Sequence, residues 1–172
     1  MQDWYVITGG PATGKSTLIE LLAAQGRLVV PEAARVVLAE EKQKDSDRLP
    51  WRDLSKFQER VAQLQWEFEQ AAWGQEAFLD RSFIDAYAYS TYGAVEPPAL
   101  IEKHARNRYK KVFLLDPLPD YVNDAQRWET QAFRDAIHPL IALAYEHFGY
   151  EPVDVPVFPP QERLAFLLAN LR

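Results

Sequence analysis

Cysteine is absent from the 172-residue chain. Without it the chain can form neither a disulfide framework nor a thiolate metal site, and such a composition fits a reducing compartment. No apolar run approaches the roughly 20 residues that a bilayer-spanning helix needs. Residues 1–4 also lack the basic segment that opens a signal peptide. These absences predict a cytoplasmic location and no membrane partner.

Positive charge is also scarce. Lys and Arg together number 19 against 25 Asp and Glu, which gives a formal net charge of −6. A protein that binds nucleic acid through its phosphates usually carries a basic surface, so nucleic acid is not an expected partner. One basic cluster lies at residues 103–111. We interpret it as a solvated surface at a helix end. The alternative is that these residues contact phosphate.

Short apolar segments alternate with helical patterns along the chain. The expected strands cover residues 4–8, 28–30, 77–79, 111–115 and 152–155. A long helix is expected from Asp53 to about Trp73, because its apolar residues recur at helical spacing. Strands separated by helices predict a five-stranded parallel sheet with helices on both faces. Such sheets bind ligands beyond the carboxyl ends of their strands.

A glycine-rich loop follows the first expected strand and matches G-x-x-x-x-G-K-[ST]. Its glycines let successive N–H groups point at phosphate oxygens, and the next helix adds its N-terminal dipole. We expect Lys15 to reach the β- and γ-phosphates and Ser16 to ligate Mg²⁺. The expected nucleotide contacts are Gly9, Gly10, Pro11, Ala12, Thr13, Gly14, Lys15, Ser16 and Thr17.

This loop predicts ATP and Mg²⁺ as cofactors. Together with the strand pattern it predicts an α/β fold, a three-layer P-loop NTPase sandwich that forms one domain over residues 1–172.

Glu32 and Arg35 follow the second expected strand. A carboxylate at this edge lies beside the phosphate site, where Glu32 can accept the proton of an acceptor hydroxyl. Arg35 lies one helical turn further and can hold a polar acceptor. The alternative is structural, because a glutamate favours a helix N-terminus and the two residues can form an i,i+3 ion pair.

Asp80 and Arg81 follow the third expected strand directly. An acid after an apolar strand beside a P-loop is expected to support Mg²⁺, and Arg81 can neutralise charge on the transferred phosphoryl group. Asp80 can also cap the next helix. Asp85 and Tyr89 lie one and two turns further and are candidates for the acceptor pocket, with tyrosine core packing as the alternative.

A polar, helix-like region follows the fourth expected strand. We expect a helical lid over about residues 117–135, with Arg127 closing over the phosphates during catalysis. Ordinary surface arginines are the alternative interpretation.

These motifs resemble those of the small P-loop kinase-like members of the AAA-type ATPase domain group. The group is similar to the nicotinamide-riboside kinase module of a bacterial NAD-biosynthesis regulator, and more distantly to deoxynucleoside kinases. The matching segments are residues 9–17, residues 30–35, Asp80-Arg81-Ser82 and Asp124-x-x-Arg127-x-Glu129. The resemblance implies that Glu32 is the catalytic base and that Arg81 contacts both phosphate and acceptor.

The leading hypothesis is an ATP-dependent kinase for a small hydroxyl-bearing metabolite, such as a nucleoside or a vitamin-like molecule. Lys15, Glu32, Arg81 and Arg127 are its candidate catalytic residues. Glu32, Arg35, Arg81 and Asp85 are the candidate acceptor contacts, and Ser16 and Asp80 the candidate metal ligands. One alternative is a regulatory ATPase that acts on a protein partner. Another is a kinase for a larger acceptor, such as a sugar nucleotide.

Overall fold

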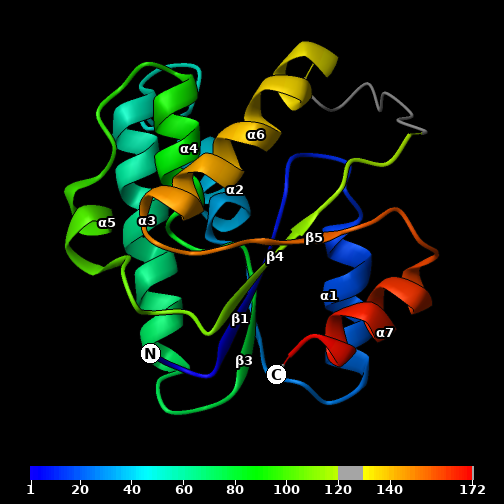
Figure 1. Ribbon diagram of the computed structural model, residues 1–172. Coiled ribbons are helices and arrows are strands. Elements are labelled where there is room, and N and C mark those ends of the chain that lie inside the picture. The colour runs from blue at the N-terminus through cyan, green and yellow to red at the C-terminus, as the bar shows by residue number, and fades with distance from the viewer. Residues whose placement is uncertain (120–129, 172) are drawn as a thin grey trace.

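The computed structural model describes residues 1–119 and 130–171. Within these ranges the chain forms a five-stranded parallel sheet with helices around it (Figure 1). The strands are β1 (Trp4–Thr8), β2 (Val29–Val30), β3 (Ala77–Asp80), β4 (Lys111–Leu115) and β5 (Val153–Val155). The helices are α1 (Lys15–Ala24), α2 (Ala33–Gln43), α3 (Leu54–Ala71), α4 (Asp85–Tyr92), α5 (Ala99–His104), α6 (Gln131–His147) and α7 (Pro160–Ala169).

The central strand β1 is buried on both faces, and its alternate side chains belong to two different cores. Trp4 and Val6 pack with residues of α3, α4 and α6, whereas Tyr5 and Ile7 pack with residues of α1 and α7. This follows from the two-residue period of a strand, which sends successive side chains to opposite faces. Figure 1 shows the resulting layers, with α1 and α7 on one side of the sheet. The predicted three-layer α/β fold is confirmed.

The long helix α3 begins where the sequence predicted. The side chain of Asp53 caps it by accepting a hydrogen bond from the backbone N–H of Lys56 at 3.0 Å. Phe57, Val61 and Leu64 lie on one face and pack against buried residues of α2. The helix-period pattern therefore identified a real contact surface between α2 and α3.

The strand order is β2-β3-β1-β4-β5. The chain leaves β1 toward β2 on one side of the sheet and leaves β4 toward β5 on the other. The carboxyl ends of β1, β3 and β4 are therefore adjacent at the point where the connections diverge, which is where such sheets bind ligands. Among the described residues, no helix is long and apolar enough to cross a membrane.

Candidate nucleotide and acceptor site

The loop between β1 and α1 depends on two glycines. Gly9 has φ +139°, and a Cβ atom added there would lie 2.8 Å from the carbonyl oxygen of Leu115 on β4. Gly14 has φ +81° and precedes α1, which no side chain of the described residues caps. Glycine is favoured at both positions because the backbone is in a region that other residues rarely adopt. The uncapped N–H groups at the start of α1 make this loop suited to an anion.

Lys15 folds back onto this loop. Its Nζ donates to the carbonyl oxygens of Gly9 at 2.9 Å and Gly10 at 2.7 Å, and to Thr13 Oγ1 at 3.1 Å. Burial, and next the positive charge of Arg81, lower the pKa of Lys15 to about 7. A bound polyphosphate would add negative charge here and so favour the charged form of the lysine.

Glu32 lies between two arginines at the edge of the site. It accepts from Arg81 Nε at 3.0 Å and from Arg35 Nε at 2.8 Å. Burial alone would raise the pKa of Glu32, but Arg81, Lys15 and Arg35 outweigh it and leave the pKa below its ordinary value. Glu32 is thus ionised at neutral pH, as a proton acceptor must be. Arg35 also donates from Nη2 to Ser16 Oγ at 3.0 Å, which links the second strand end to the P-loop.

Arg81 has an unusual backbone conformation. Its φ is +66°, in the left-handed region that residues other than glycine seldom adopt, and its N–H donates to the carbonyl of Ile7 at 3.0 Å. This geometry turns the buried guanidinium toward Glu32 and toward Asp85, which accepts from Nη1 at 2.9 Å. The guanidinium also lies over the ring of Tyr89, 5.5 Å from its centroid. Strained backbone of this kind concentrates at functional sites.

Asp85 lies behind Arg81 and is buried. Besides Arg81, it accepts from the Thr8 hydroxyl, from the backbone N–H of Ser82 at 3.0 Å and from Tyr145 OH at 2.6 Å. Four donors on one carboxylate hold it, and through it the guanidinium, in place. Both oxygens of Asp85 already accept from these donors. Direct contact between Asp85 and an acceptor stays a prediction.

Asp80, at the end of β3, has the features expected of a residue that supports Mg²⁺. It is 8% exposed, and its Oδ1 is a buried acceptor with no hydrogen-bond partner in the described part of the chain. Burial, together with the charge of Glu32, raises its pKa, while Lys15 and Arg81 act against this shift. An unpaired buried carboxylate oxygen is costly unless a cation or water reaches it. Arg35 links the Ser16 hydroxyl to Glu32, whose charge acts on Asp80, and the residues present fit a phosphate-bound Mg²⁺.

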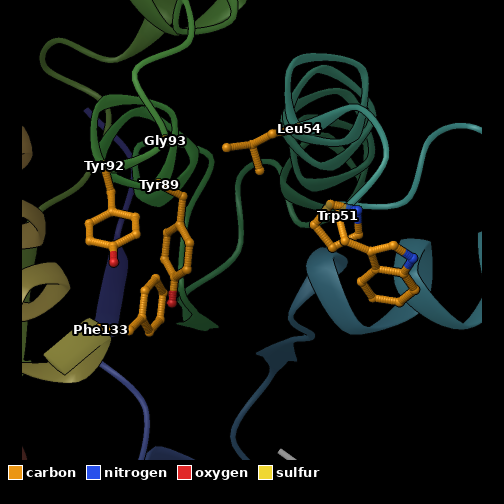
Figure 2. Close-up of a pocket in the computed structure, with 7 residues that line it drawn as sticks. Trp51, Leu54, Tyr89, Tyr92, Gly93 and Phe133 are labelled. Carbon is orange, nitrogen blue, oxygen red and sulfur yellow. The ribbon is translucent and has the colours of Figure 1, made fainter. Parts of the chain in front are cut away.

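An aromatic pocket adjoins this polar cluster. The cavity measures about 160 Å³ and is lined by Pro50, Trp51, Leu54, Tyr89, Tyr92, Gly93 and Phe133. Figure 2 shows the rings of Tyr89, Tyr92 and Phe133 on one side of it, opposite Trp51 and Leu54. Tyr89 belongs both to this pocket and to the surface under Arg81, so the pocket begins where the charged cluster ends. The sequence suggested Tyr89, but it did not suggest the combination of Trp51, Tyr92 and Phe133.

Helix α6 contacts the P-loop from the side of the predicted lid. The N–H of Gly10 donates to His138 Nδ1 at 3.4 Å, and burial lowers the pKa of this histidine, which favours the neutral form that accepts. Residues 120–129 of the predicted lid, with Arg127, lie outside the described residues. The catalytic role of Arg127 therefore stays a prediction.

Two contributors to the site were missed by sequence reasoning. Arg163 on α7 donates to a P-loop carbonyl, and His138 on α6 accepts from a P-loop amide. Neither lies at a strand end or in a recognised motif. The one available signal was the place of Arg163 beside the leucines of an amphipathic helix, where a charged residue is unusual.

A P-loop at the switch point of this sheet, with acidic and basic residues at the next strand ends, defines a P-loop kinase-like NTPase domain. More particularly, the chain belongs to the AAA domain family, whose model matches residues 4–163. A search of curated protein sequences finds no match.

Solved structures of kinase-like domains share the fold. NadR in complex with NR is 20% identical with a TM-score of 0.65, and the alignment covers 90% of this chain and 45% of that chain. NadR in complex with NAD and AMP-PNP is 18% identical with a TM-score of 0.69, covering 98% and 48%. Deoxyadenosine kinase from M. mycoides with bound dATP is 13% identical with a TM-score of 0.59, covering 98% of each chain. This chain thus spans about half the length of the NadR structures, and the likeness is one of fold.

Proposed function

We propose that this protein is a kinase that transfers the γ-phosphoryl group of ATP to a hydroxyl of a small, ring-bearing metabolite. One observation carries the proposal. The guanidinium of Arg81 bonds to Glu32 and covers Tyr89, so a candidate base and an aromatic pocket share one cation. The proposed phosphate site is the P-loop, where the charge of Lys15 acts on Glu32 and Ser16 is bonded to Arg35, the second arginine that contacts Glu32.

In the proposed reaction Glu32 accepts the proton of the acceptor hydroxyl. The acceptor oxygen then forms a bond to the γ-phosphorus while the bond from that phosphorus to the ADP oxygen breaks. Lys15 and Arg81 stabilise the negative charge on the group in transfer, and Arg127 is proposed to assist. Ser16 and Asp80 would hold Mg²⁺, which supplies neutralisation of charge on the β- and γ-phosphates when bound.

The aromatic pocket supports an acceptor with a planar ring. Its lining is almost entirely apolar, and aromatic side chains stack on rings of many kinds. The compared structures contain NR, NAD, AMP-PNP and dATP. A nucleoside-like acceptor, with its ring in the pocket and a sugar hydroxyl toward Glu32, agrees with both observations. Arg35, whose side chain is 67% exposed, can turn toward such a sugar.

The first test is ADP release from Mg·ATP, alone and with a panel of nucleosides, nicotinamide riboside and vitamin alcohols. Strong stimulation by one compound, with one phosphorylated product per ADP, is the expected result. Slow turnover that no compound stimulates would contradict the small-molecule kinase. It would favour a regulatory ATPase, which membership of the AAA domain family also accommodates.

The second test is the variant Glu32→Gln. It should lower kcat with the stimulating acceptor by about 100- to 10,000-fold, because a general base contributes on that order. Binding of Mg·ATP, measured by calorimetry, should persist. The matched control is Glu59→Gln, an exposed glutamate on α3 that should behave as wild type. Wild-type turnover in Glu32→Gln would remove Glu32 from the mechanism.

A further inference from the structure

Arg163 is a buried arginine on the C-terminal helix that binds three loops at once. It is 3% exposed. Its Nη1 donates to the carbonyl of Thr13, its Nη2 to the carbonyl of Asp116 at 3.1 Å and its Nε to the carbonyl of Pro156 at 2.8 Å. These carbonyls belong to the loops that follow β1, β4 and β5. One guanidinium thus joins the three strand ends on the α7 side of the P-loop.

The contact with Thr13 determines the direction of an adjacent amide. In a trans peptide the C=O and the following N–H point to opposite sides, and the described chain has no cis peptide. Because Arg163 holds the Thr13 carbonyl, the N–H of Gly14 points away from α7. A Cβ atom on Gly14 would lie 3.3 Å from Arg163 Nη1, so the missing side chain makes room for the guanidinium.

The contact with Pro156 extends the same support to the loop after β5. Residues 156–159 connect β5 to α7, and Val157 and Phe158 expose large apolar side chains there. At the carboxyl edge of the sheet such side chains can border a nucleotide base. The arginine therefore connects the phosphate loop directly to a second surface at the ligand-binding edge.

We propose that Arg163 is a positioning residue for the nucleotide. It orients the Thr13–Gly14 peptide so that the Gly14 N–H faces the polyphosphate, and it couples the P-loop to the 156–159 loop. The guanidinium uses its donors on backbone carbonyls and acts on the phosphates through the peptide that it orients. The inference rests on the proposed nucleotide site and is independent of which acceptor the protein uses.

The test measures binding rather than turnover. Arg163→Lys and Arg163→Met are titrated with Mg·ATP and with inorganic tripolyphosphate by calorimetry. A lysine cannot reproduce the three-carbonyl contact, because it carries one ammonium in place of a planar fork. Both variants should bind Mg·ATP roughly tenfold or more weakly, equivalent to the loss of one well-placed hydrogen bond to a charged group. The affinity for tripolyphosphate, which has no nucleotide base, should fall by a similar factor.

The control for helix packing is Leu167→Ala, a fully buried residue on the same helix that belongs to the α1–α7 core. It should lower the melting temperature and leave the Kd for Mg·ATP unchanged at a temperature where the protein is folded. The proposal fails if the Arg163 variants lower only the melting temperature, as is expected of Leu167→Ala, because Arg163 would then contribute to helix packing alone. If the wild-type protein binds neither probe, the nucleotide site itself is wrong and both proposals fail.

Discussion

Arg81 is the residue on which the proposed site depends most. Its backbone is in the left-handed region and its charge is buried. Three neighbours orient its guanidinium, namely Glu32, Asp85 and Tyr89. Residues in such conformations cost about 1–3 kcal/mol and persist when the surroundings determine them. The cost is explained if the direction of this guanidinium matters for phosphoryl transfer.

Gly9 supports a prediction at the same scale. Gly9→Ala should abolish measurable Mg·ATP binding and lower the free energy of unfolding by about 1–3 kcal/mol, because the new Cβ meets the Leu115 carbonyl at 2.8 Å. The matched control is Gly26→Ala, which has φ +76° and open space within 4 Å. It should share the backbone strain but keep nucleotide binding. Urea unfolding and calorimetry measure the two quantities, and equal ATP affinity in both variants would contradict the argument.

At the scale of elements, one buried ion pair joins α3 to the segment ahead of β4. Glu69 is fully buried and accepts from Arg108 Nε at 2.6 Å and from Tyr109 OH at 3.0 Å. The guanidinium of Arg108 contacts the rings of Trp4 and Trp66, at 4.8 and 4.1 Å from their centroids. The desolvation of two buried charges offsets much of their attraction, so the pair is weak evidence for added stability, although it does connect α3 to the segment before β4.

The pH dependence of stability tests this pair. Burial raises the pKa of Glu69 to about 7, against the opposing effects of Arg108 and Tyr109. Because this pKa lies above that of the unfolded chain, the contribution of Glu69 to stability is complete below about pH 4.3 and is lost as the pH rises through 7. In Glu69→Gln the side chain at position 69 has no carboxyl group to titrate. The free energy of unfolding of wild type, relative to this variant, should therefore fall between pH 5.5 and 8.

Urea unfolding at pH 5.5, 7 and 8 provides the measurement. Glu59→Gln, on the exposed face of the same helix, should run parallel to wild type at every pH. Parallel curves for wild type and Glu69→Gln would show that Glu69 does not titrate with a raised pKa.

At the scale of the whole molecule, the site is assembled from loops that belong to different layers. The P-loop leads into α1 on one face of the sheet, whereas Arg81 leads into α4 on the other. A ligand that contacts both loops joins the two layers, so its binding free energy adds to the stability of the folded chain.

Nucleotide binding should accordingly raise the melting temperature. Mg·ATP at 100 times its Kd should stabilise the protein by about 2.7 kcal/mol, a shift of roughly 5–10 °C for a domain of this size. Removal of Mg²⁺ with a chelator should reduce the shift, since the proposed ligands Asp80 and Ser16 would then have no cation to share with the phosphates. Lys15→Ala should abolish it. Differential scanning calorimetry measures all three, and a full shift in Lys15→Ala would contradict the P-loop assignment.

Much of this architecture could be predicted from the sequence because its signals are local. The short, mostly apolar strands of two to five residues, the Asp53 cap of α3 and the loop at residues 9–17 each depend on neighbouring residues. The rule that parallel strands bind ligands at their carboxyl ends then pointed to Glu32, Asp80 and Arg81. The structure brings Glu32 and Arg81 into direct contact, although 49 residues separate them.

The sequence by itself therefore determined the fold class, the P-loop motif and the charged residues at the strand ends. The reason is that the spacing of apolar residues and the loop motif both depend on residues close together in the chain. The tertiary structure alone decided which distant residues support them. Arg163 reaches Thr13 across 150 residues and Tyr145 reaches Asp85 across 60, while the aromatic pocket combines three separate segments. Such contacts arise from the packing of helices on the sheet, and no local pattern in the chain records them.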